Sequence, residues 1–550
     1  MEDRLRRHRQ VGVDVVPGLG KLALVEQDLV LGHGALLGLA EWYSHSAGHG
    51  EPVTPASRLA PDRKEAMLSW LDSQNGRSPM IHRVPAFLLT LSLLATPLLA
   101  ADGALDPGFN GTGKVTTVFN PSSLVNSDQA FAVLVQPDQK IVTVGFLTDV
   151  SDPADFGAAR YNPDGTLDHT FGNNGLVRVG FGFFTADEAF AAVRQPDGKI
   201  VLGGYTTAVV PLPSPAFALV RLKTDGTLDP QFGSGGKVQT DLGGDDWIFA
   251  LALQPDGKIL AAGITGSPAS HDFALVRYNA NGSLDTAFGT GGKVKTDFSG
   301  REDRPAAVAV QKDGKILIAG VSSPTAAPNS PQQMALARYT AAGKPDTTFG
   351  TGGKTLLALG GRSAATALRV LSTGKILVGG GLLQAAGGYN FLVVRLNPNG
   401  TLDTTFGTGG KVTTDFGGRT DGIHGIAVLT NGQIVAGGEA NATSFGSGDG
   451  VFALARYTAN GQLDTTFGTG GKVTTQLGDR GSRGTSLAVQ ANGRIVLAGH
   501  VFSTNPAQGT AFGLARYLTA VPPQALAAQD AAEGEDVEGL QPEDHLPLEE

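Results

Sequence analysis

The sequence predicts an all-β chain whose body, from about Leu105 to Ala520, is a seven-bladed β-propeller with four antiparallel strands in each blade. Three observations support this prediction. The motif L-D-x-x-F-G, or a close variant, returns seven times at intervals of 56 to 62 residues. Each interval contains four short apolar runs with strand character, separated by turn signals. The first and last repeats are incomplete in complementary ways, so that the two ends together make one blade.

The third repeat shows the four expected strands most clearly, at Trp247–Gln254, Lys258–Gly263, Phe273–Tyr278 and Lys293–Phe298. We refer to these positions in every repeat as strands a, b, c and d. Turn sequences such as Pro255-Asp256-Gly257 separate a from b, and Asn281-Gly282 follows c. An Asp or Asn before Gly is a strong hairpin signal because glycine tolerates a positive φ.

The ring is predicted to close with one strand from the N-terminal side. A run of d type, Gly113–Phe119, precedes any a strand. The last repeat has a near Ser486–Gln490, b near Arg494–Gly499 and c at Phe512–Leu518, but no d. We therefore expect Gly113–Phe119 to pair beside Phe512–Leu518, which removes the open sheet edges that favour aggregation.

The repeated sequences L-D-x-x-F-G-x-x-G-K-V, P-D-G-K-I-L and F-A-L-x-R-Y-N-x-D-G resemble the delta-60 repeat family over about 105–520, in seven copies. That family occurs in tandem in exported bacterial proteins and has no established general activity. The resemblance therefore implies a fold and a location outside the cytoplasm, and it assigns no catalytic residue.

A secretory signal peptide is predicted at 80–101. Met80-Ile81-His82-Arg83 is followed by the apolar run Val84–Ala100 and then by small residues, which are the parts of such a signal. We interpret 1–79, which lack the repeat, as a non-native or disordered extension before an initiator at Met80. The alternative keeps 1–79 as a cytoplasmic segment and 84–100 as an uncleaved anchor, although the run is short for a membrane span. We expect a secreted, periplasmic or cell-envelope protein with no membrane insertion after signal removal.

Composition narrows the class of protein further. The chain has no cysteine, which excludes disulfides, thiolate metal sites and a cysteine nucleophile. The formal net charge of −9 comes from 521–550, which hold nine acidic residues and no Lys or Arg, and this composition predicts a disordered acidic tail. The rest of the chain is close to neutral, which argues against nucleic-acid binding. We expect a monomer.

One face of the propeller is predicted to bind ligands. The a–b and c–d connections keep constant lengths, whereas the b–c and d–a connections at the opposite end of the blades vary, and variable loops are where binding sites diversify. We call this end the variable face. Its loops contain acids, arginines and aromatics, including Tyr205, Glu439 and Arg483. The candidate ligand-binding residues selected from it are Asp187, Glu188, Asp245, Asp246, Trp247, His271, Arg301, Asp303, Arg362, Arg419, His424, Arg480 and His500.

A second repeated set is predicted to be structural. An arginine in strand c and the aspartate of L-D-x-x-F-G recur in the blades, and a buried charged pair beside a tight turn would stabilise the fold. We expect Arg277 to point between blades toward Asp285 or the equivalent aspartate of the neighbouring repeat. The set comprises Arg160, Arg221, Arg277, Arg338, Arg395, Arg456 and Arg516 with Asp168, Asp229, Asp285, Asp346, Asp403 and Asp464.

No catalytic or cofactor motif stands out in the repeats. Phe349–Thr355 resembles a phosphate-binding loop, but Thr348 stands where that loop requires its first glycine. The propeller histidines lack metal-ligand spacing, so we predict no metal or cofactor. Calcium at a pair of acids such as Asp245-Asp246 is the one alternative left open.

Two functions are compatible with the sequence. The leading hypothesis is a non-enzymatic binding or scaffold module that uses the variable face to hold a glycan or a peptide. The alternative is an extracytoplasmic lyase or hydrolase that acts on polysaccharide. Such an enzyme would need acids and a His or Arg from non-adjacent blades to meet near one point.

Residues 1–79 and 521–550 are expected to be dispensable for folding, because ordering them would cost conformational entropy without burying apolar surface. Deleting both segments should leave the melting temperature of the propeller unchanged. N-terminal sequencing of the exported protein should begin near Ala101 or Asp102. A mature chain that starts before Met80 would contradict the predicted signal.

Overall fold

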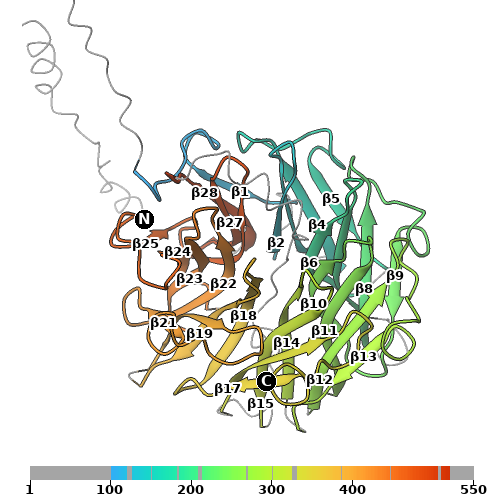
Figure 1. The fold of residues 1–550 in the computed structure, drawn as a ribbon. Coiled ribbons are helices and arrows are strands. Elements are labelled where there is room, and N and C mark those ends of the chain that lie inside the picture. Colours follow the sequence, from blue (N-terminus) through green and yellow to red (C-terminus); the bar gives the residue numbers. More distant parts are fainter. Residues whose placement is uncertain are drawn as a thin grey trace, which may run out of the picture. The chain divides into compact units, whose positions relative to one another are not determined.

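The computed structural model describes residues 101–120, 127–149, 152–182, 185–207, 214–267, 270–299, 302–324, 331–385, 387–445, 447–505 and 509–520. Except for Ala101, the predicted extension, signal and acidic tail lie outside these residues. The described residues form strands and turns without an α-helix, arranged as seven four-stranded antiparallel sheets (Figure 1). The prediction of a seven-bladed β-propeller is thereby confirmed. Within the same residues no helix is both long and apolar enough to span a bilayer.

The blades are numbered 1 to 7 in the order of their a strands. Strand a is β2 (Gln129–Val135), β6 (Asp187–Arg194), β10 (Trp247–Leu253), β14 (Glu302–Val310), β18 (Ser363–Val370), β22 (Thr420–Val428) and β26 (Gly481–Val489). Strand b is β3 (Ile141–Asp149), β7 (Ile200–Thr207), β11 (Ile259–Ser267), β15 (Ile316–Ser323), β19 (Ile376–Leu383), β23 (Ile434–Ala442) and β27 (Ile495–Phe502). Each a strand contacts the a strands of the two neighbouring blades, so these strands form the inner wall of the ring.

Strands c and d form the outer half of each blade. Strand c is β4 (Asp152–Tyr161), β8 (Pro215–Leu222), β12 (Ser270–Tyr278), β16 (Gln333–Tyr339), β20 (Tyr389–Leu396), β24 (Val451–Tyr457) and β28 (Thr510–Tyr517). Strand d is β5 (Leu176–Val179), β9 (Lys237–Thr240), β13 (Lys293–Thr296), β17 (Lys354–Leu357), β21 (Lys411–Thr414), β25 (Lys472–Thr475) and β1 (Lys114–Thr117). Several b and c strands extend further into the variable face than the sequence pattern predicts.

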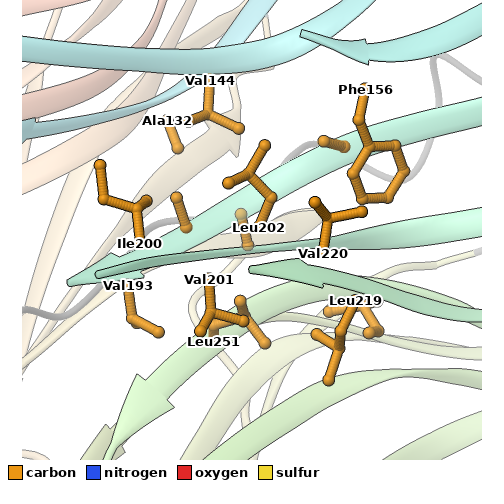
Figure 2. Close-up of a cluster of buried hydrophobic side chains, with 14 of the residues drawn as sticks. Ala132, Val144, Phe156, Val193, Ile200, Val201, Leu202, Leu219, Val220 and Leu251 are labelled. Atoms are coloured by element: carbon orange, nitrogen blue, oxygen red, sulfur yellow. The ribbon is translucent and has the colours of Figure 1, made fainter. Parts of the chain in front are cut away.

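Each blade is apolar on both faces because it packs between two others. Side chains alternate along a strand, and in β7 Ile200 and Leu202 point to one side while Val201 points to the other (Figure 2). Leu202 lies toward Val144 of blade 1, whereas Val201 lies toward Leu251 of blade 3 (Figure 2). The continuous Val, Ile, Leu and Ala runs of strands a to c therefore reflect burial on both sides of the sheet.

An arginine–aspartate pair connects each blade to the next one, and we call this set of contacts the charged joint. It lies on the face opposite the variable face, which we call the fixed face. Arg277 Nε donates to Asp285 Oδ2 at 2.8 Å, and Arg277 Nη1 donates to the carbonyl oxygen of Ala341 in blade 4 at 2.6 Å. The Arg277 guanidinium also lies over the ring of Phe288 in the L-D-x-x-F-G motif, with its Cζ 4.3 Å from the ring centre. The aspartate partner thus belongs to the same blade as the arginine.

The joint recurs around the ring. In all seven blades the Cζ of the strand-c arginine lies 4.3 to 4.7 Å from the centre of the motif phenylalanine. Every one of these arginines forms an ion pair with the aspartate of its own blade, and Arg516 uses Asp106. The motif also binds the turn of the next blade: Gly233 N of blade 2 donates to the Asn281 carbonyl oxygen of blade 3 at 2.9 Å.

The turn glycine is required at this contact. Gly282 has a φ of +86°, and a Cβ there would lie 2.9 Å from Phe232 of the preceding blade. Only glycine combines a positive φ with this close approach at no steric cost. The Asn-Gly and Asp-Gly turns that follow strand c are therefore contacts between blades as well as hairpin signals.

The ring closes as predicted. Strand β1 pairs with β28 in antiparallel register, with Lys114 opposite Ala515 and Thr117 opposite Phe512. The N-terminal segment also completes the c–d turn of blade 7, since Gly103 N donates to the Leu518 carbonyl oxygen at 2.8 Å. Asp102 carries an ion pair to Arg456 of blade 6 at 2.6 Å. Both ends of the described chain are thus tied into one blade.

Replacing Arg277 with alanine is expected to destabilise the fold by about 3–5 kcal/mol, because it leaves the buried Asp285 without its main partner and removes a bond to blade 4. Arg301 of the variable face lies outside the described residues and is not used as the control. Arg419→Ala is the matched control, because its side chain is 59% exposed and its pair with Asp449 spans 3.6 Å. Urea unfolding of both variants decides the question, and equal losses would contradict a structural role for the joint.

Candidate functional site

Each a strand carries a β-bulge at the same repeat position, and β22 has a second irregularity between Thr420 and Gly422. The pairing of a with b skips one a residue there. Bulges redirect side chains and are frequent beside functional sites. The bulged residues, all buried, are Phe131, Phe190, Phe249, Ala306, Thr366, His424 and Thr485. Their chemistry changes around the ring, from aromatic in blades 1 to 3 to polar in blades 5 to 7.

The three bulged phenylalanines form one aromatic cluster across blades 1 to 3. The ring centres of Phe131 and Phe190 lie 5.3 Å apart in an edge-to-face arrangement. Those of Phe190 and Phe249 lie 5.8 Å apart and are stacked. Because each ring comes from the a strand of a different blade, the cluster joins three blades at the inner wall of the ring.

An acid and two further aromatics lie beside this cluster, nearer the variable face. Glu188 and Tyr205 are directly opposite each other in β6 and β7, and the Tyr205 hydroxyl donates to the Glu188 carboxylate. The rings of Tyr205 and Trp247 are nearly parallel, with centres 4.9 Å apart. Burial raises the pKa of Glu188 to about 7. Glu188 Oε2 is also buried and has no hydrogen-bond partner among the described residues.

Blades 6 and 7 contribute a buried charged cluster at the same level. Glu439 Oε1 lies 3.5 Å from Arg483 Nε and 3.8 Å from His424 Nε2. His424, Glu439, Arg483 and His500 are at most 3% exposed. The His500 ring contacts Phe131 with centres 5.5 Å apart, so this charged cluster adjoins the aromatic cluster. The charged cluster and the aromatic cluster therefore form one continuous arc of contacts, which runs from blade 6 through blades 7, 1 and 2 to blade 3.

A separate histidine pair joins blades 3 and 4. His271 Nδ1 lies 2.6 Å from Glu302 Oε1, and Arg304 Nε donates to the same oxygen at 2.8 Å. His271 Nε2 is 3.9 Å from Asp245 Oδ2. Hydrogen bonds from the His271 side chain and backbone outweigh burial and lower the pKa of Glu302. His271 and Asp245 are thus brought together, as part of a contact between two blades.

Three of the predicted ligand-binding acids serve the backbone instead. Asp187, Asp246 and Asp303 are fully buried, and each carboxylate accepts a hydrogen bond from the backbone N–H that follows the preceding d strand, at 2.6, 2.5 and 2.7 Å. Asp128 and Asp421 do the same in blades 1 and 6. The repeat position explains the difference from the prediction, because an acid at the start of strand a closes the d–a connection.

One group of acids has the spacing of a metal site. Asp272, Asp297 and Asp303 each offer a carboxylate oxygen, and these oxygens lie within 4.8 Å of one another. The group differs from the predicted pair Asp245-Asp246. Lys295 Nζ lies 2.6 Å from Asp272 Oδ2, and Asp303 already accepts from Phe298 N. The ammonium group of Lys295 therefore supplies positive charge beside these carboxylates.

The remaining predicted residues lie apart from the arc. Arg419 is exposed, and Arg480 is exposed with Nη2 donating to the Ser447 carbonyl oxygen at 3.2 Å. Arg362 is partly buried immediately before β18. Arg301 lies outside the described residues. In the described part of the chain, each cluster is built from neighbouring blades, and no cluster unites an acid with a His or Arg from non-adjacent blades.

Sequence reasoning missed the three phenylalanines of the aromatic cluster. Their signal was present, since Phe131, Phe190 and Phe249 each stand three residues after the acid that begins strand a. His424 occupies the same position in blade 6 and lies inside β22, not in a loop. Aligning the repeats at that acid would have shown both the buried acid and the bulged residue that follows it.

Six segments of the chain match a family model described as "Domain of unknown function (DUF5122) beta-propeller", at 136–171, 195–232, 254–288, 311–349, 371–406 and 429–467. Each match runs from the end of strand a to the phenylalanine of L-D-x-x-F-G. The blade divided between the two ends of the propeller is not among them. The matches agree with a repeat β-propeller. A comparison with curated proteins gave no match.

Several solved structures are similar to this chain at low identity. A protein of unknown function from Bacteroides caccae is 14% identical, with 64% of this chain and 100% of that chain covered and a TM-score of 0.33. An ulvan lyase of polysaccharide lyase family PL25, bound to -[GlcA(1-4)Rha3S]-, is 11% identical, with 74% and 96% covered and a TM-score of 0.43. A glucose dehydrogenase is 12% identical, with 72% and 98% covered and a TM-score of 0.32. Likenesses of this size carry no argument about function.

Proposed function

We propose that the chain is a glycan-binding module that acts outside the cytoplasm, with its site on the variable face at blades 2 and 3. The observation that supports it is the parallel Tyr205–Trp247 pair beside the Glu188 carboxyl. Trp247 and Glu188 are partly exposed, while Phe190 and Phe249 pack beneath them. The site thus combines apolar ring surface with a polar group, as small-molecule sites commonly do.

The chemistry of a sugar fits this combination. A pyranose ring has an apolar C–H face that packs on an aromatic ring, and its hydroxyls need hydrogen-bond partners once water is removed. Trp247 supplies the flat surface, and the partly exposed Glu188 side chain supplies a polar group beside it. A carboxyl with a pKa of about 7 can donate or accept near neutral pH, which suits a hydroxyl ligand.

A polysaccharide hydrolase or lyase is the second candidate, and the raised pKa of Glu188 is the observation that favours it. A general acid or base works best when its pKa lies near the working pH. The two-carboxylate mechanism of most glycosidases also needs a second acid facing the first. Glu188 belongs to blade 2 and the buried Glu439 to blade 6, so these two carboxyls are not neighbours in the ring. Binding without turnover is therefore the preferred function.

Trp247→Ala is expected to weaken glycan binding at least about tenfold, because aromatic side chains dominate the energy of such contacts. A screen of the full chain against neutral and acidic oligosaccharides identifies the ligand, and titration calorimetry measures the variants. Trp247→Ala should still fold, since Ala364 and Gly422 stand at the same repeat position. Trp247→Phe should recover part of the affinity.

Tyr389→Ala, an aromatic change on the same face in blade 5, serves as the control and should bind normally. Assays for released reducing ends and for unsaturated uronate test the enzyme alternative. Added calcium and added chelator test whether a metal takes part. Affinity that is unchanged in Trp247→Ala would place the site elsewhere, and turnover that is lost in Glu188→Gln would favour the enzyme.

The stability of the fold is expected to decrease between about pH 4.5 and pH 7. Burial raises the pKa of Glu188 to about 7, so the folded state holds a proton that the unfolded state has already released at these pH values. The effect of Glu188 alone is on the order of 3 kcal/mol. Melting temperatures of Glu188→Gln should therefore change less across this range than those of the natural chain. Asp303, whose pKa burial raises to about 6, adds in the same direction. Identical pH profiles for both proteins would contradict the buried position of Glu188.

A further inference from the structure

The residue after strand a differs in two neighbouring blades. It is glutamine in blades 1 to 4 and 7, but Leu371 in blade 5 and Leu429 in blade 6. Where it is glutamine, it fills the space beside the charged joint: Gln195 Oε1 accepts from Arg221 Nη1 at 3.2 Å. In blade 7, Gln490 Nε2 donates to the Gln139 carbonyl oxygen of blade 1 at 3.1 Å. Blades 5 and 6 lack these polar contacts.

A cavity of about 580 Å³ lies where the two leucines stand. It is lined by the ends of the a strands of blades 1, 5, 6 and 7 on the fixed face, with Leu371, Val428, Leu429, Leu487 and Val489 among its apolar residues. This volume is within the range of small-molecule sites. The cavity is therefore on the opposite face of the propeller from Glu188 and Trp247.

The charge around this cavity is positive. Its lining includes Arg369, Lys375 and Arg395 and contains no Asp or Glu. Lys375 Nζ and Arg395 Nε share one carboxylate, Asp403 Oδ2, at 2.7 and 2.6 Å, which leaves a net positive charge at the pair. The a–b turns add to this, because the aspartates of blades 1 to 4 are replaced by Thr373 and Asn431 in blades 5 and 6.

We propose that this cavity binds an amphipathic carboxylate, a molecule with an apolar chain and one anionic head group. The apolar residues of the lining would bury the chain away from water. Arg369, whose Nε donates to the Ile426 carbonyl oxygen at 3.2 Å, and Lys375, whose Nζ donates to Asp403, supply the positive charge that attracts the carboxylate. The inference does not depend on the glycan proposal, because the two sites are on opposite faces and share no residue.

Titration calorimetry of the full chain with sodium decanoate tests the proposal. Octyl glucoside and decyltrimethylammonium are the neutral and cationic probes with similar chains. Decanoate should bind in a saturable way at one site, octyl glucoside more weakly, and the cation weakest of all. Equal binding of the three probes, or no binding of decanoate, would overturn the proposal.

Two variants locate the site. Leu429→Gln restores the residue of five other blades, so it should fold, and it should weaken decanoate binding at least about tenfold by placing a polar side chain in the cavity. Arg369→Gln should weaken decanoate but leave octyl glucoside unchanged. Lys344→Gln, an exposed fixed-face cation in blade 4 outside the cavity lining, is the control. Loss of decanoate binding in the control, or full binding in Leu429→Gln with an unchanged melting temperature, would place the ligand elsewhere.

Discussion

The arginine of strand c makes three different contacts at once. In blade 3 the Arg277 guanidinium is held by Asp285, lies over Phe288 and donates to a backbone carbonyl of blade 4. An arginine can meet all three requirements because its planar group offers several donors and a flat face at once. The length of the c–d connection cannot change without moving the aspartate. The constant spacing of this connection in the sequence is therefore a direct result of the joint.

Closure of the ring depends on the same joint. Blade 7 has no c–d turn of its own, and the chain near Asp102 supplies one by pairing with Leu518. Asp102 then forms an ion pair with Arg456 of blade 6. At the same position in the other blades, the arginine contacts a carbonyl oxygen of the turn, as Arg277 does with Ala341. A propeller with unjoined ends would expose the edges of two sheets. The interface between blades 6 and 7 is therefore built from the same contacts as the other six, with the Asp102 carboxylate in place of a backbone carbonyl.

Much of the fold could be predicted because the repeated sequence indicates where each strand and turn of a blade lies. Spacing, turn residues and the surplus d strand were enough to predict seven blades and their closure. The site could not be predicted in the same way, since it depends on which residues face each other across blades. Asp187 looks like a loop acid in the sequence, yet its carboxylate caps a backbone N–H inside the fold. His424 was placed on a loop because the length of β22 was underestimated. The cavity at Leu429 depends on two neighbouring substitutions whose effect appears only when the blades are packed.

The surroundings of buried carboxyls also differ between the two ends of the blades. At the fixed face Asp346 is buried, but hydrogen bonds from Thr348 and the charge of Arg338 outweigh desolvation and lower its pKa to about 2. At the start of strand a, Asp421 receives backbone hydrogen bonds without an adjacent arginine, and burial raises its pKa to about 6. The Thr348 hydrogen bonds and the Arg338 charge therefore more than offset the cost of burying Asp346, whereas the two backbone donors at Asp421 do not offset its burial. Acids of the fixed face are therefore committed to their arginines, and the lining of the cavity at blades 5 and 6, where the turn aspartates are replaced, contains basic residues and no acid. Near the variable face, burial raises the pKa of Glu188, Asp303 and Asp421 toward neutral pH. Glu302 differs, because hydrogen bonds from His271 and Arg304 outweigh burial and lower its pKa.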